Sequence, residues 1–73
     1  MFPQRLKEIR KSKHITQKQV ASAIEATERS YQSYEYGKHQ PTLPVLIALA
    51  DFFDVSLDYL TGRSDNPNSH KLP

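Results

Sequence analysis

The sequence predicts one all-α domain built from five short helices. Apolar residues recur at helical spacing, and a Ser or Thr that can cap a helix precedes four of the five expected helices. The 73 residues include no cysteine, so neither a disulfide framework nor a thiolate metal site can hold the fold together. A chain of this length has room for one small core. Packing between helices must therefore supply the stability.

The first two helices are expected at the start of the chain. The first begins near Pro3, which suits a first helical turn, and ends in the polar run 11–14. The second is indicated by Thr16, which can form a capping box with Gln19. Its narrow apolar face, whose small residues allow close packing, comprises Val20, Ala21, Ala23 and Ile24.

The third helix follows the second after a tight turn. Only Glu25 and Ala26 intervene before Thr27, a second N-cap candidate. The helix then runs to Gly37, which suits the left-handed position just past a helix end. The pattern therefore predicts a helix, a turn and a second helix.

The fourth and fifth helices complete the domain. Thr42 can cap the fourth, and its first turn tolerates Pro44 because the N–H groups there have no partner within the helix. Ser56 can cap a short fifth helix, which Gly62 ends. We expect the fourth helix to bury an apolar stripe made of Leu43, Leu46, Ile47, Ala50 and Phe53.

The folded domain is expected to cover residues 1–63. Residues 64–73 are polar and contain two prolines, so they predict a disordered tail. The longest apolar stretch, 43–53, is too short to cross a bilayer, and no signal-peptide pattern opens the chain. We therefore expect a cytoplasmic protein without a membrane partner.

Charge is distributed unevenly along the chain. Residues 1–40 carry a formal charge of +4 and residues 41–73 carry −2, within a total of +2. A basic half of this kind suits a polyanion such as nucleic acid, or an anionic surface. An ordinary solvated helix face explains the same charges. Charge alone therefore does not decide between these interpretations.

The third helix separates into two faces when its residues are placed about 100° apart. Tyr31 and Tyr34 fall on one side, where they can anchor the helix to the core. Arg29 could bond to guanine through its guanidinium fork, Gln32 to adenine, and Glu28 to cytosine N4. The alternative is a solvated surface helix with no ligand. The residues that this polar side offers as base readers are Glu28, Arg29, Gln32 and Ser33.

Several short motifs recur in order along the chain. They are Leu6 to Arg10 (LKEIR), Thr16 to Ala21 (TQKQVA), Thr27, Tyr34-Glu35, Gly37-Lys38, Pro41-Thr42, Leu49-Ala50 and Val55 to Leu60 (VSLDYL). Together they resemble the Cro/CI-type helix-turn-helix family, often called the XRE family, over residues 5–62. The resemblance implies a lambda-repressor-like DNA-binding domain whose helix-turn-helix lies in the second and third helices.

The resemblance also implies roles for individual positions. Those that match the family's base readers are Glu28, Arg29, Gln32 and Ser33. Those that match contacts to the DNA backbone are Gln17, Lys18, Thr27, Tyr36, Lys38 and His39. Arg10 and Glu35 match a pair that forms a partly buried ion pair in some members, and we assign this pair to structure rather than to readout.

Two departures from the family pattern affect the expected interface. Glu25 stands where the family usually has a glycine, and a left-handed non-glycine residue costs on the order of 1 kcal/mol. The stretch after the third helix is also less basic than in many members, because Lys38 is its only fixed charge. We therefore expect a differently shaped turn. We also expect an affinity for phosphates that either is modest or draws on Arg5, Lys7, Arg10, Lys11, Lys13 and Lys18.

The expected function is that of a sequence-specific transcriptional regulator, a repressor encoded by a bacterium or a phage and associated with the nucleoid when bound. One recognition helix covers few base pairs, so we expect a homodimer on palindromic double-stranded DNA with half-sites roughly 34 Å apart. The fifth helix and the loop before the fourth are the expected dimer seam. The alternative is an antitoxin-like protein-interaction module that keeps the fold and binds another protein through residues 43–60.

No group of residues predicts an enzyme, a metal site or a cofactor. His14, His39 and His70 are scattered over three segments without a helical pair or a carboxylate cluster. The chain has only two glycines, so it has no glycine-rich phosphate loop, and no nucleophile can be paired with an obvious base. We therefore expect no catalytic activity, no cofactor and no small-molecule ligand.

Overall fold

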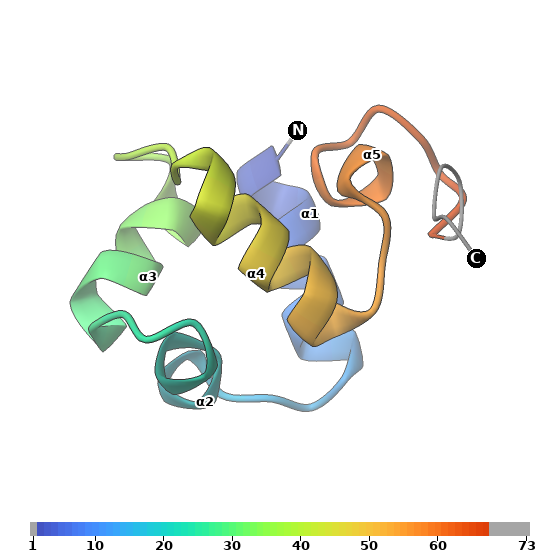
Figure 1. Ribbon diagram of the computed structural model, residues 1–73. Helices are drawn as coiled ribbons and strands as arrows, with labels where there is room; N and C mark the ends of the chain where they lie inside the picture. Colours follow the sequence, from blue (N-terminus) through green and yellow to red (C-terminus); the bar gives the residue numbers. More distant parts are fainter. Residues whose placement is uncertain (1, 68–73) are drawn as a thin grey trace.

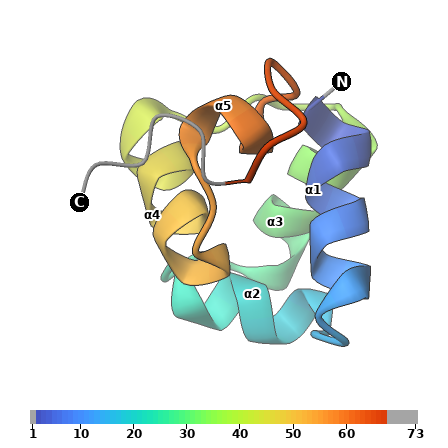
Figure 2. The ribbon, with the colours of Figure 1, turned by 90° about the vertical axis from the view of Figure 1, so that its right-hand side faces the viewer.

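The computed structural model describes residues 2–67, and every regular element within that range is an α-helix. Figure 1 shows α4 crossing in front of α1, and Figure 2 shows α1 and α4 on opposite sides of the molecule with α2 below and α5 above. The predicted all-α fold of five helices is confirmed. The helices are α1 (Phe2–Ser12), α2 (Gln17–Ala23), α3 (Glu28–Tyr36), α4 (Leu43–Phe53) and α5 (Leu57–Leu60).

The helix starts follow from local capping. Thr16 Oγ1 accepts a hydrogen bond from Gln19 N at 3.1 Å, and Gln19 Oε1 accepts one from Thr16 N at 2.8 Å, which completes the predicted capping box. The hydroxyls of Thr27 and Ser56 cap α3 and α5 as expected. Thr42 occupies the predicted N-cap position of α4 with an extended backbone, but its side chain makes no cap hydrogen bond.

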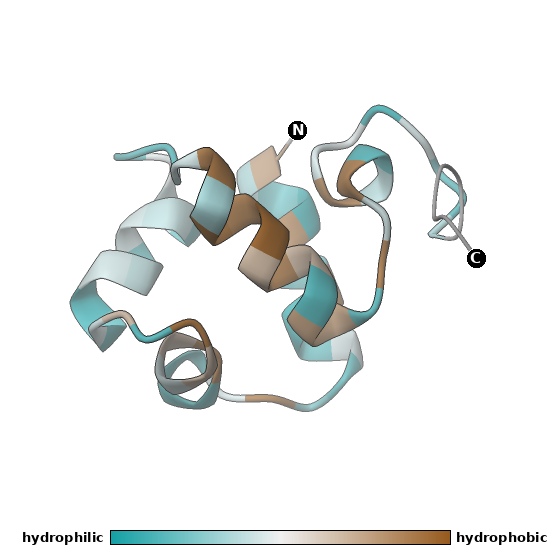
Figure 3. Cartoon of the chain, in the orientation of Figure 1, coloured by the Kyte–Doolittle hydropathy of each residue, from teal (hydrophilic) through white to brown (hydrophobic). Residues whose placement is uncertain are grey.

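All five helices contribute to a single core. Ala23, which we expected on the packed face of α2, is exposed. The reason is that this face is centred on Val20 and Ala21, about 110° around the helix from Ala23. Figure 3 shows hydrophobic residues concentrated along α4. The buried apolar residues are Leu6, Ile9, Val20, Ala21, Tyr31, Leu49, Ala50, Phe53, Val55 and Leu60.

The predicted buried stripe of α4 is wrong in two positions. Leu43 is 62% exposed and Ile47 is 44% exposed, whereas Leu49, which the stripe omitted, is fully buried. The other members of the stripe are buried or partly buried. Almost every residue of α4 is apolar, so the helical period fits more than one face. Contacts with the other helices, not the period, select the face that packs.

The chain continues beyond α5 along the domain. The Arg5 guanidinium lies 4.3 Å from the centre of the Tyr59 ring and donates hydrogen bonds to Ser64 O at 3.2 Å and Asp65 Oδ1 at 3.1 Å. Pro67 O accepts a hydrogen bond from the backbone of α5's cap residue at 2.8 Å. Ser64, Asp65 and Pro67, from the start of the expected tail, thus contact the domain. The expectation for 68–73 concerns residues outside those that the structure describes.

Candidate nucleic-acid interface

The turn between α2 and α3 keeps a left-handed residue without a glycine. Glu25 has a φ of 58°, and the chain around it is closed by a hydrogen bond from Ala26 N to Ala21 O at 2.9 Å. A side chain in this conformation costs on the order of 1 kcal/mol, which the surrounding packing must offset. The backbone is therefore left-handed at Glu25, which stands where the family usually has glycine, in the turn that we expected to differ in shape.

Aromatic packing sets the orientation of α3. Tyr31 is fully buried and Tyr34 is half-buried, and their rings meet edge to face with centroids 6.5 Å apart. The predicted anchoring face is thus confirmed. Because this side of the helix is fixed to the core, the opposite side is presented to solvent. Arg29 and Glu28 are exposed there, and Gln32 and Ser33 are partly exposed.

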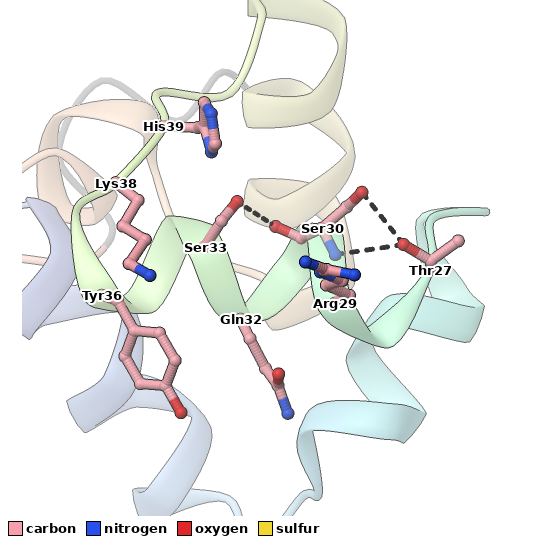
Figure 4. Close-up of a pocket in the computed structure, with 8 residues that line it drawn as sticks. All are labelled: Thr27, Arg29, Ser30, Gln32, Ser33, Tyr36, Lys38 and His39. Atoms are coloured by element: carbon pink, nitrogen blue, oxygen red, sulfur yellow. Dashed lines mark hydrogen bonds between the residues drawn. The ribbon is translucent and has the colours of Figure 1, made fainter.

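The exposed side of α3 and the loop that follows it form a shallow groove of about 430 Å³. Ser30, which is not among the expected base readers, also lines this groove. It lies only about 60° around the helix from Ser33. Glu28, Gln17 and Lys18 are not among the lining residues. Figure 4 shows the residues that line it: Thr27, Arg29, Ser30, Gln32, Ser33, Tyr36, Lys38 and His39.

Two small hydroxyls of the groove, those of Thr27 and Ser33, donate their protons to oxygens of Ser30. Ser33 Oγ donates to Ser30 O at 2.6 Å, and Thr27 Oγ1 donates to Ser30 Oγ at 3.0 Å (Figure 4). Their oxygens therefore offer mainly acceptor lone pairs to a ligand. The strong donors in the groove belong to longer side chains, above all Arg29 and Lys38. Such a donor-rich surface suits phosphate oxygens and the acceptor groups of guanine.

Gly37 turns the chain so that the loop adds to the same groove. Its φ of 78° is the left-handed conformation predicted for the end of α3, and its N–H bonds back to carbonyls of the last helical turn. Lys38 N then donates to Ser33 O at 2.9 Å. Lys38 and His39 consequently line the groove beside Arg29 rather than pointing away from it.

Behind α3, Arg10 and Glu35 form the ion pair that the resemblance implied. Arg10 Nε lies 2.5 Å from Glu35 Oε2, and the side chains are 12% and 1% exposed. Burial by itself raises the pKa of Glu35, but hydrogen bonds from Arg10 and Gln17 outweigh it and lower the pKa below its usual value. The hydrogen bond to Glu35 in turn raises the pKa of Arg10. Both groups are therefore charged at neutral pH.

The Tyr31 hydroxyl is buried beside this pair. It has no hydrogen-bond partner of good geometry among the described residues. Burial, together with the nearby Glu35 carboxylate, raises the pKa of Tyr31 well above its usual value. Tyr31 therefore stays neutral, and its role is to fill the core under α3.

Residues 2–67, the part of the chain that the structure describes, give no evidence of a metal site or of a membrane-spanning helix. That range holds no group of three or more His, Cys, Asp or Glu side chains placed to bind a metal. None of its helices combines the length and the apolar character that crossing a bilayer requires. His70, one of the three histidines considered above, lies outside the described residues.

Comparison with known families agrees with this architecture. Residues 6–60 match the family described as helix-turn-helix. The chain belongs to this family. The match includes α2, the left-handed turn and α3, and it extends through most of α1 to the end of α5. The lambda-repressor-like fold expected from the sequence motifs is thus confirmed.

Similar proteins are named as regulators of transcription. The chain is 40% identical to the HTH-type transcriptional regulator YobD of Bacillus subtilis over 93% of its own length and 61% of that protein. It is 40% identical to the cryptic phage CTXphi transcriptional repressor RstR of Vibrio cholerae over 94% of its own length and 62% of that protein. The chain therefore spans about three-fifths of the length of these relatives.

A solved structure shows the same fold. The crystal structure of a transcriptional regulator from Listeria innocua superposes with a TM-score of 0.81 and 29% identity. The similarity covers 85% of this chain and 58% of the other. The arrangement of the helices around α3 is thus shared with a protein named as a regulator.

Proposed function

We propose that this chain is a sequence-specific double-stranded DNA-binding transcriptional regulator, and specifically a repressor. The groove along α3 carries this proposal, because it joins side chains suited to base edges with cations suited to phosphates on one exposed surface. An α-helix fits the major groove of B-form DNA, where each base pair presents a distinct pattern of donors and acceptors. The family and the names of the relatives support the same function.

Within this proposal the residues divide into two roles. The base readers are Glu28, Arg29, Gln32 and Ser33, to which the groove adds Ser30 as a candidate. Glu28 is exposed at the edge of α3 and acts mainly by accepting from cytosine or repelling a wrong base. The residues that contact the DNA backbone are Gln17, Lys18, Thr27, Tyr36, Lys38 and His39.

Replacing Arg29 with alanine should relax the preference at one base position. A bidentate pair with guanine contributes about 1–3 kcal/mol of discrimination, and the variant loses both donors. Lys38→Ala serves as the matched control, since it removes a cation from the same groove. It should weaken binding to all sequences alike and lower the salt slope by about 1. Selection from a random duplex pool, followed by salt titration of the selected site, measures both effects.

Identical behaviour of the two variants on every duplex would overturn this division of roles.

The fold permits a second function, because the exposed apolar side chains Leu43, Ile47, Phe52 and Leu57 all lie between residues 43 and 60. These side chains could receive another protein in an antitoxin-like module. If the protein failed to bind random duplex even at low salt, this second function would replace the first.

We further propose a homodimer on a palindromic operator, with α5 in the dimer seam. Leu57 at the start of α5 is 38% exposed, as an interface residue of the free subunit would be. Leu57→Lys should shift a dimer towards monomer and weaken binding to the palindrome more than to a half-site. Phe52→Lys is the control, because Phe52 is 39% exposed but lies on α4 outside the proposed seam.

Sedimentation at several protein concentrations measures this prediction. Equal effects of the two substitutions on the monomer–dimer equilibrium would show that α5 does not lie in the seam.

As a regulator of transcription, the protein would act in the cytoplasm, at the nucleoid, without catalytic activity.

A further inference from the structure

A chain of hydrogen bonds leads from the buried ion pair to the surface of α3. Gln17 Nε2 donates to Glu35 Oε1 at 3.0 Å, and Gln32 Nε2 donates to Gln17 Oε1 at 3.1 Å. Arg10 holds the same carboxylate through Nε and Nη2, at 2.5 and 3.2 Å. The chain thus joins α1, α2 and α3, and it ends on a side chain that lines the candidate interface.

The Glu35 carboxylate determines which way each amide in this series of hydrogen bonds is turned. An ionised carboxylate only accepts hydrogen bonds, so Gln17 must turn its NH₂ group, not its oxygen, towards Glu35. The two ends of an amide look alike in size, but the charge of Glu35 distinguishes them. Gln17 Oε1 therefore faces α3 as an acceptor.

The same reasoning applies one step further along the chain. A carbonyl oxygen also only accepts, so Gln32 must turn its own NH₂ group towards Gln17. This leaves Gln32 Oε1 and its second N–H for a ligand. Adenine presents a donor at N6 and an acceptor at N7, which match these two groups, whereas guanine presents two acceptors.

We propose that Gln17 is a positioning residue. The Glu35 carboxylate fixes the orientation of the Gln17 amide, which in turn fixes the orientation of the Gln32 amide and so sets the preference of Gln32 for adenine over guanine. This inference rests on the DNA-binding function proposed above. It also gives the Arg10–Glu35 pair a part in readout, beyond the structural role expected from the sequence. Without Gln17 the amide of Gln32 can rotate and offer its NH₂ group to guanine O6 or N7.

The test separates positioning from a simple phosphate contact. Duplexes selected from a random pool by the wild-type protein and by Gln32→Met identify the base position that Gln32 reads. Gln17→Met keeps the length of the side chain but removes both its donor and its acceptor. We expect the adenine-to-guanine ratio at that position to fall roughly fivefold or more in Gln17→Met, with other positions unchanged.

Two controls use residues next to this network. Lys18→Ala, adjacent to Gln17 but outside the hydrogen-bond chain, should lower affinity for all bases equally. In the Gln32→Met background, Gln17→Met should have no further effect on the ratio, because the residue that it positions is gone. A loss of affinity in Gln17→Met that left the adenine-to-guanine ratio unchanged would overturn the inference and leave Gln17 as a phosphate contact alone.

A measurement on the free wild-type protein does not depend on the variants folding. The side-chain amide protons of Gln32 should exchange with solvent more slowly than those of Gln4, an exposed glutamine on α1. Equally fast exchange at Gln32 and Gln4 in nuclear magnetic resonance spectra would show that the chain of hydrogen bonds does not persist. Absence of duplex binding by the wild-type protein would instead refute the proposed function and leave the exchange result intact.

Discussion

Glu35→Gln should lower the free energy of unfolding by about 3 kcal/mol or more at neutral pH. Removing one charge of a buried pair leaves the other without compensation in a poorly solvated place, and such changes cost roughly 3–5 kcal/mol. The Glu35 side chain is 1% exposed and Arg10 is 12% exposed, so water can replace little of the lost interaction. Urea unfolding followed by circular dichroism measures the difference.

The loss of stability in Glu35→Gln should become smaller as the pH falls. The folded-state pKa of Glu35 is lowered, so its stabilising contribution is complete above the unfolded-state pKa, which is about 4.3, and disappears as pH falls through the folded-state pKa. The gap in stability between wild type and Glu35→Gln should therefore narrow in acid. Glu28→Gln is the control, since Glu28 is exposed on the same helix. A gap that stayed constant from pH 7 to pH 2 would contradict this account.

Leu49→Ala should lower the free energy of unfolding by roughly 2–5 kcal/mol, the range for a buried leucine whose removal leaves a cavity. Leu49 is fully buried in the centre of α4 among core residues from the other helices. For a domain of this size the loss is a large part of the total stability. Thermal or urea unfolding at one fixed protein concentration measures it.

Ile47→Ala is the matched control for this prediction. Ile47 lies two residues away on the same helix, loses the same number of carbon atoms on substitution, and is 44% exposed. We expect it to cost about 1 kcal/mol or less, because much of its surface is already in water. A larger loss of stability in Ile47→Ala than in Leu49→Ala would contradict this account. It would indicate that Ile47 lies on the packed face of α4, as the apolar stripe predicted.

The sequence predicted those features that depend on neighbouring residues. The capping of α2 by Thr16, the capping of α3 by Thr27 and the left-handed turn at Gly37 after α3 all involve groups within four residues of one another. The polar and aromatic sides of α3 follow from the same short range, because a helix fixes the directions of its own side chains. The side of α3 that faces away from the core could therefore be predicted without a structure.

Tertiary structure alone decided the features that depend on distant residues. The packed face of α4 was ambiguous because the helix is apolar nearly all round, and only contacts with other helices place Leu49 inside and Leu43 outside. The bonds of Gln17 to Glu35 and Gln32 join residues 18 and 15 positions apart, on different helices. Periodicity and capping describe one helix at a time. Contacts between helices depend on how the whole chain packs, and here they determine which residues support α3.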